Sequence, residues 1–106
     1  MDFRATGNEP GWLLEIVGDR SIRMLIDYGN NRVVTPVPPL QLSEGKKIYA
    51  AQTEAHRIRI VIEPESCIDK MSGQKFESEV TVYLDDEIFT GCGQSFQKLS
   101  TVNSEQ

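Results

Sequence analysis

Hydrophobic and polar residues alternate along most of the chain, and the period is two residues rather than the 3.6 of a helix. The clearest run is RIRIVIE, residues 57–63. Its isoleucines at every second position would face a core, and the charged residues between them would face solvent. Similar runs cover residues 3–6, 12–17, 21–27, 32–37, 47–53, 79–84 and 87–92. The pattern therefore predicts about eight short strands and no dominant helix.

Turn-forming residues separate these runs, for example at 18–20, 28–31 and 85–86. The segment PVPPL, residues 36–40, cannot lie in a central strand because proline donates no ladder hydrogen bond, so we expect an edge or a connection there. The near-regular spacing predicts an antiparallel meander closed into a small β-barrel, with a β-sandwich as the alternative. We assign residues 1–94 to this single domain and residues 95–106 to a polar C-terminal tail.

The chain has 106 residues, which is the length of one domain, and it carries a net charge of −5. An acidic chain without a basic stripe is unsuited to the phosphate backbone, so we expect no nucleic-acid partner and favour a basic protein such as a lysozyme. No apolar run approaches 18 residues, which predicts no transmembrane helix. We also expect that a leader segment was removed, and a lipid anchor in the precursor is compatible with this.

Two cysteines lie at the ends of predicted strands: Cys67 follows the strongest strand, and Cys92 lies in GCG near the end of the last one. If the strands that carry them are neighbours in the sheet, the sulfurs can meet, and we predict a disulfide and an oxidising compartment. The alternative is two unrelated buried thiols. Two cysteines and one histidine make a poor zinc set, so we expect no metal and no cofactor, and we interpret His56 as an ordinary surface residue.

Two segments together resemble a known family. RATGNEPGWLLEI, residues 4–16, and CIDKMSGQKFESEVTVYLDDEIFTGCG, residues 67–93, are similar to uncharacterised bacterial periplasmic proteins and lipoproteins with a GNEPxW opening, a CxDxMS loop and a closing GC strand. Domains of this family also occur beside META-type and lysozyme-inhibitor-type domains. Gly11 stands where a family member usually has an aromatic residue. The resemblance implies a small periplasmic or outer-membrane-tethered β-domain, and it implies no settled activity.

A looser resemblance concerns the loop Ser72-Gly73-Gln74-Lys75-Phe76, which looks like the SGxxY loop of inhibitors of c-type lysozyme. Those inhibitors are also small eight-stranded barrels with a disulfide, and their loop enters the lysozyme cleft. The resemblance implies that Ser72 hydrogen-bonds a catalytic carboxylate and that Lys75 supplies a cation near it. Phe76 stands where the family has tyrosine, so a contact through a phenol hydroxyl is lost.

A purely structural interpretation of the loop is also open. Asp69 could accept backbone N–H bonds, Ser72 and Gly73 could form the turn itself, and Met71 could fill a gap at the barrel mouth. At the other end of the sequence, Trp12 is a candidate plug for one end of the barrel. Glu9 is a candidate buried acid that ties down the opening turn.

These features favour a binding domain over an enzyme, because His56 is the only histidine available as a base and nothing places it beside Ser72 or a cysteine. The leading hypothesis is a non-catalytic cell-envelope domain that binds a protein through the loop 67–76, with Asp69, Ser72, Lys75 and Phe76 as contact residues. One alternative is an inhibitor of a lysozyme-like glycosidase. The other is a binder of a small molecule in the barrel mouth.

Overall fold

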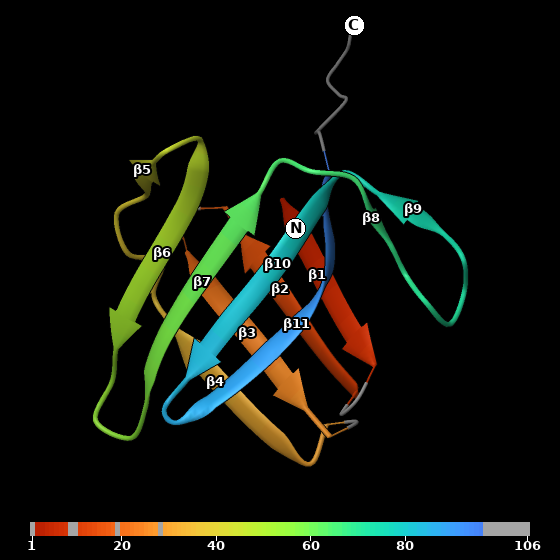
Figure 1. Cartoon of the computed structure of the whole chain (residues 1–106). Coiled ribbons are helices and arrows are strands. Elements are labelled where there is room, and N and C mark those ends of the chain that lie inside the picture. The colour runs from red at the N-terminus through yellow and green to blue at the C-terminus, as the bar shows by residue number, and fades with distance from the viewer. Residues whose placement is uncertain (1, 9–10, 19, 28, 97–106) are drawn as a thin grey trace, which may run out of the picture.

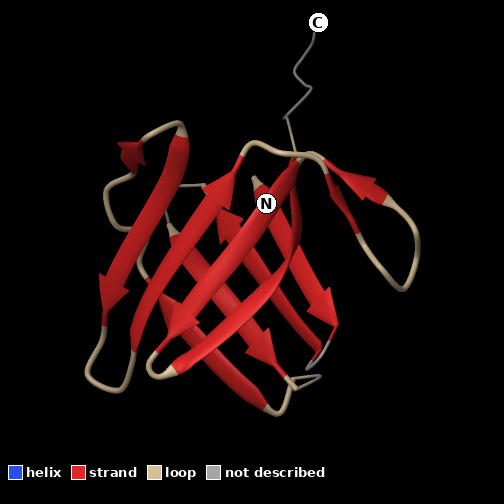
Figure 2. Cartoon of the chain, viewed as in Figure 1, coloured by secondary structure: helices blue, strands red, loops and turns tan. Residues whose placement is uncertain are grey.

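A computed structural model describes residues 2–8, 11–18, 20–27 and 29–96, and this part of the chain contains eleven strands and no helix (Figures 1 and 2). It therefore contains no helix long and apolar enough to cross a membrane. The strands are β1 (Phe3–Asn8), β2 (Gly11–Val17), β3 (Ser21–Ile26), β4 (Asn31–Thr35), β5 (Gln41–Ser43), β6 (Lys46–Gln52), β7 (Arg57–Glu63), β8 (Cys67–Ile68), β9 (Lys75–Phe76), β10 (Ser78–Leu84) and β11 (Glu87–Ser95).

Nine of the strands form one antiparallel sheet in the order β4-β3-β2-β1-β11-β10-β7-β6-β5. The sheet curls into a half-barrel, with β1 to β4 forming one layer and β6, β7, β10 and β11 crossing in front of it (Figure 1). The first and last strands lie side by side in the middle of the order, with Phe3 opposite Ser95 and Thr6 opposite Cys92. The predicted all-β antiparallel fold is therefore confirmed.

The hydrogen-bonded order ends at β4 on one side and at β5 on the other. These two strands are consecutive in the sequence and are joined by residues 36–40, which contain three of the five prolines. Proline has no N–H to give to a ladder, so the segment connects the two edges without pairing them. The curled sheet is thus continuous except at this proline seam (residues 36–40).

The core fills the space between the two layers. On each long strand, every second residue faces inward, as the alternating sequence predicts. The fully buried large side chains come from four different strands of the sheet, β2, β3, β7 and β10: Leu14, Ile22, Met24, Ile58, Ile60, Val80 and Val82. Because these side chains interlock across both layers, the curled shape is held by burial of apolar surface as well as by the ladders.

Three short strands are additional to the eight that the alternation predicted. β5 has three residues, and β8 and β9 have two each, which is too short for a period of two to be visible. β8 and β9 pair with each other in a separate small sheet, so the polar loop between residues 67 and 76 is itself a hairpin. The last strand continues through Ser95, one residue beyond the assigned domain end.

Candidate functional site

The β8–β9 hairpin (residues 67–76) projects from the side of the half-barrel, next to β11 and β1 (Figure 1). It is tied to the main sheet by the predicted disulfide, since Cys67 on β8 is bonded to Cys92 on β11 with 5.5 Å between their Cα atoms. Cys92 points out of the core, yet it is only 4 % exposed. Phe76 is half-buried and lies opposite Cys67 in the small ladder.

A second brace joins the hairpin to β1. Asn8 Nδ2 at the end of β1 donates a hydrogen bond of 2.7 Å to Asp69 Oδ1, across 61 residues of sequence. The other carboxylate oxygen, Oδ2, accepts the Ser72 backbone N–H at 2.9 Å. The Asp69 backbone also closes the turn, because its carbonyl accepts the Gly73 N–H and its N–H donates to the Gln74 carbonyl. Asp69 therefore both closes the turn of the hairpin and links the hairpin to β1.

The ionised form of Asp69 is the one that this arrangement favours. The side chain of Ser72, then that of Asn8, and then the Ser72 backbone N–H hold the pKa of Asp69 below its ordinary value of 3.8. A lowered pKa means that these bonds contribute fully above pH 3.8. Their contribution is lost as the pH falls through the lower pKa of the folded state. The hairpin is thus braced throughout the neutral range.

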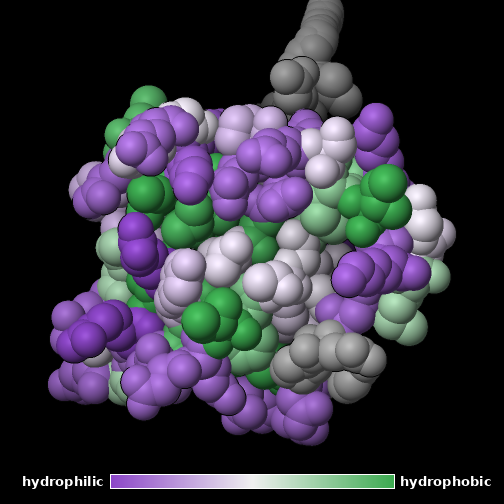
Figure 3. Space-filling view, in the orientation of Figure 1, coloured by the Kyte–Doolittle hydropathy of each residue, from purple (hydrophilic) through white to green (hydrophobic). Residues whose placement is uncertain are grey.

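The exposed surface of the hairpin combines apolar and charged side chains, which lie next to each other in Figure 3. Ile68 is 64 % exposed and Met71 is 78 % exposed, although both are large and apolar. Ser72 and Lys75 are exposed as well. Met71 therefore does not fill a gap at the barrel mouth, and that part of the structural interpretation is wrong.

A groove of about 510 Å³ runs between the hairpin and the main sheet. Its walls are residues 67–71 of the hairpin, which include Ile68 and Met71, the end of β1, and outward-facing positions of β10 and β11 such as Thr81 and Thr90. Asp69 and Asn8, which are joined by their hydrogen bond, both line the groove. The hairpin is therefore separated from the sheet by this groove and is joined to the sheet by the disulfide and by the Asn8–Asp69 hydrogen bond.

The structure brings the predicted contact residues into one element but gives them different places. Asp69, next to the turn, and Phe76, at the base, are half-buried, whereas Ser72 and Lys75 are exposed. The sequence analysis missed Ile68 and Met71 as exposed residues. The available signal was that two large apolar residues interrupt an otherwise polar loop, where no neighbouring run gives them a core to face.

Trp12 lies among the core residues, 5 % exposed, and its Nε1 donates a hydrogen bond of 3.2 Å to the carbonyl of Thr90 on β11. Its ring packs so close to Gly7 and Gly91 that a Cβ on either glycine would overlap it. The indole thus fastens β2 to β11 across β1, between the two layers. Glu9, the candidate acid of the opening turn, lies outside the described residues.

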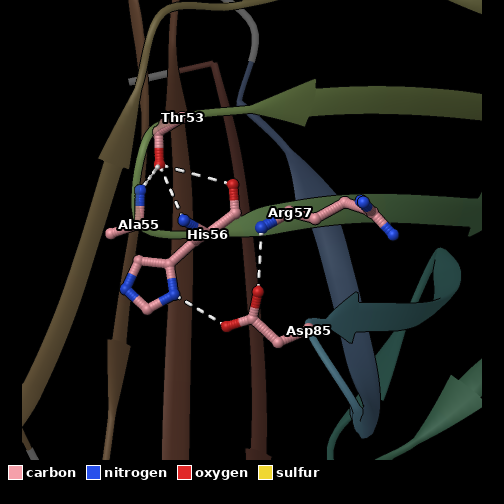
Figure 4. A network of polar contacts seen from close by, with 5 residues as sticks. All are labelled: Thr53, Ala55, His56, Arg57 and Asp85. Carbon is pink, nitrogen blue, oxygen red and sulfur yellow. Dashed lines mark hydrogen bonds and ion pairs between the residues drawn. The ribbon is translucent and has the colours of Figure 1, made fainter.

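His56 takes part in a polar network in the β6–β7 turn (Figure 4). Its Nδ1 lies 2.8 Å from Asp85 Oδ2, and the other oxygen of Asp85 accepts the Arg57 backbone N–H. The bond from His56 is the main reason that the pKa of Asp85 is lowered. Asp85 follows the last residue of β10 and the hairpin precedes its first, so about 20 Å of strand separates the network from Ser72.

The described residues contain no group of three histidine, cysteine, aspartate or glutamate side chains that could hold a metal ion. Comparison of the chain with protein-family models, with curated proteins and with solved structures found no match.

Proposed function

We propose that the protein is a non-catalytic bacterial cell-envelope domain that binds another protein through the β8–β9 hairpin. The observation that carries the proposal is the exposure of Ile68 and Met71 on an element that is braced at its base. Exposed large apolar side chains on a projecting element are typical of contact surfaces. A hairpin that is already ordered loses little conformational entropy on binding, which favours affinity.

The disulfide supports a location in the periplasm or on the outer membrane, because such bonds persist in oxidising compartments. The charge distribution supports a partner of mixed charge. Residues 67–76 contain two lysines and one aspartate, so the hairpin is +1 while the whole chain is −5. A basic protein with an acidic cleft complements both charges. Its overall positive charge attracts the acidic chain at long range, and its acidic cleft suits the positively charged hairpin.

This charge pattern also favours the inhibitor alternative, in which Ser72 and Lys75 enter the cleft of a lysozyme-like glycosidase. Such clefts hold two carboxylates, and the exposed ammonium group of Lys75 suits them. The Ser72 hydroxyl already accepts the Gln74 N–H at 3.1 Å and lies beside Asp69. Lys75 is therefore the stronger contributor of the two in this alternative.

The proposal is tested by capturing binding partners from a bacterial envelope extract with matched variants. In the test variant, Ile68→Ser is combined with Met71→Ser. In the control variant, Ile88→Ser is combined with Leu42→Ser, because Ile88 is also 64 % exposed and Leu42 is 72 % exposed, both away from the hairpin. We expect the hairpin variant to lose at least about 90 % of the partner, which corresponds to a tenfold weaker complex, while the control keeps it.

The inhibitor alternative is tested separately, by measuring how strongly the oxidised protein inhibits c-, g- and i-type lysozymes. We expect Lys75→Ala to raise the inhibitory concentration about tenfold and Ser72→Ala to raise it less. Ser43→Ala and Lys46→Ala, on the β5–β6 hairpin, serve as controls. No inhibition at tens of micromolar removes this alternative. Partner capture that survives in the Ile68/Met71 variant contradicts the hairpin proposal itself.

A further inference from the structure

A second cavity opens at the end of the half-barrel where β1 and β10 begin and β2, β7 and β11 end. Its volume is about 490 Å³, within the range of pockets that hold small molecules. It is distinct from the groove beneath the hairpin, and the two share no lining residue. This mouth cavity lies between the two layers and opens to solvent.

The floor of the mouth cavity is apolar. Phe3, Ile16 and Ile62 belong to the core, with exposed fractions between 4 % and 7 %, and they border the cavity with their outermost atoms. Tyr49 is half-buried, packs against the same core and forms part of the wall. An apolar ligand body that covers these side chains would remove them from water, which favours binding.

Ser78 is an unusual polar residue in this wall. It is 7 % exposed, it faces inward at the start of β10, and it lines the cavity. Within the described part of the chain its hydroxyl has no hydrogen-bond partner. A buried hydroxyl without a partner costs free energy, and native proteins satisfy nearly all such groups. The Ser78 hydroxyl is therefore placed to bond a group that enters the cavity.

Lys47 is exposed and brings a positive charge to the opening of the cavity, which it lines. It precedes the inward-facing Tyr49 by two residues, and it pairs with Ile62, another inward-facing position, so it lies on the inner side of β6. Two acids, Asp2 and Glu77, also line the rim, each immediately before the first residue of a strand. The Glu77 carboxylate is moreover engaged, because it accepts the Ser95 N–H.

We propose that the mouth cavity binds a small monocarboxylic acid with an apolar body. The carboxylate is held by the Lys47 ammonium group and the Ser78 hydroxyl, and the apolar body lies on Phe3, Ile16 and Ile62. A charge-assisted hydrogen bond from lysine and a bond from a hydroxyl that is otherwise unpartnered in the described chain both favour an anion over a neutral head group. This site does not depend on the hairpin or on a protein partner.

Isothermal titration with octanoate, 1-octanol and octylamine tests the proposal, with 3-phenylpropanoate as an acid of different shape. We expect an acid to bind about tenfold more tightly than the alcohol and the amine, and Lys47→Met to abolish this preference. Ser78→Ala should weaken acid binding about threefold or more. Lys46→Met is the matched control, because Lys46 is the adjacent lysine and lies 4.0 Å from Glu63 in an ion pair.

Urea unfolding shows that each variant is folded before it is titrated. The proposal is overturned if neither acid binds at millimolar concentration, or if the alcohol or the amine binds as tightly as the acid. It is also overturned if Lys46→Met weakens acid binding as much as Lys47→Met does, because the inward position of Lys47 would then make no difference.

Discussion

Removal of the Cys67–Cys92 disulfide is expected to lower the free energy of unfolding by about 3 to 4 kcal/mol. The bond closes a loop with a sequence separation of 25 residues, and cross-linking a loop of this size restricts the unfolded chain. The double variant Cys67→Ala/Cys92→Ala and the reduced wild-type protein should both show this loss in urea unfolding. A loss below about 1 kcal/mol would contradict the assigned role of the bond.

The same change should also loosen the hairpin. Without the disulfide, the Asn8–Asp69 hydrogen bond remains as a side-chain link to the main sheet. We expect amide hydrogen exchange at residues 68–76 to accelerate far more than exchange in β7. The control is the addition of reductant to the double alanine variant, which should change neither stability nor exchange, because that variant contains no cysteine.

Gly91→Ala is expected to destabilise the fold by at least about 3 kcal/mol. A Cβ at Gly91 would lie 1.9 Å from the carbonyl oxygen of Thr6 and 2.8 Å from Cζ2 of Trp12. The nearer atom belongs to the backbone of β1, which cannot rotate away as a flexible side chain would. The substitution therefore has to force β1 and β11 apart at the point where the two ends of the sequence meet.

Gly73→Ala is the matched control for this prediction. Gly73 lies at the tip of the hairpin with a φ of +74°, and nothing stands within 4 Å of a Cβ placed there. The cost should be the backbone strain alone, about 1 kcal/mol, and it should be confined to the hairpin. Urea unfolding of both variants decides the matter. If Gly91→Ala costs no more than Gly73→Ala, the close packing of β1 on β11 is not what the structure indicates.

The strands that were predicted well are those whose side chains alternate over at least five residues. In β7, three isoleucines at every second position fix which face is buried, and a slip of one residue would expose all of them. The prolines of residues 36–40 likewise predicted a break, and the sheet order ends on either side of them. The disulfide could be predicted because it needed only that β11 should come close to the end of β7.

The functional surface was harder to predict because it depends on contacts that no local pattern encodes. The Asn8–Asp69 bond joins residues 61 positions apart, and it forms only because β1 pairs with β11. The two-residue ladder of β8 and β9 is too short to show alternation. The inward position of Lys47, by contrast, could have been predicted, since it continues the alternation of Tyr49 and Ala51.

The central claim is that the β8–β9 hairpin is a pre-built, rigid binding element, and backbone ¹⁵N relaxation of the free, oxidised protein tests it most directly. Residues 57–63 of β7 provide the rigid reference within the same spectrum. We expect order parameters of about 0.85 at residues 68–76, equal to those of β7. Values below about 0.6 across the tip would show that the hairpin is flexible before it meets a partner, and they would contradict this account.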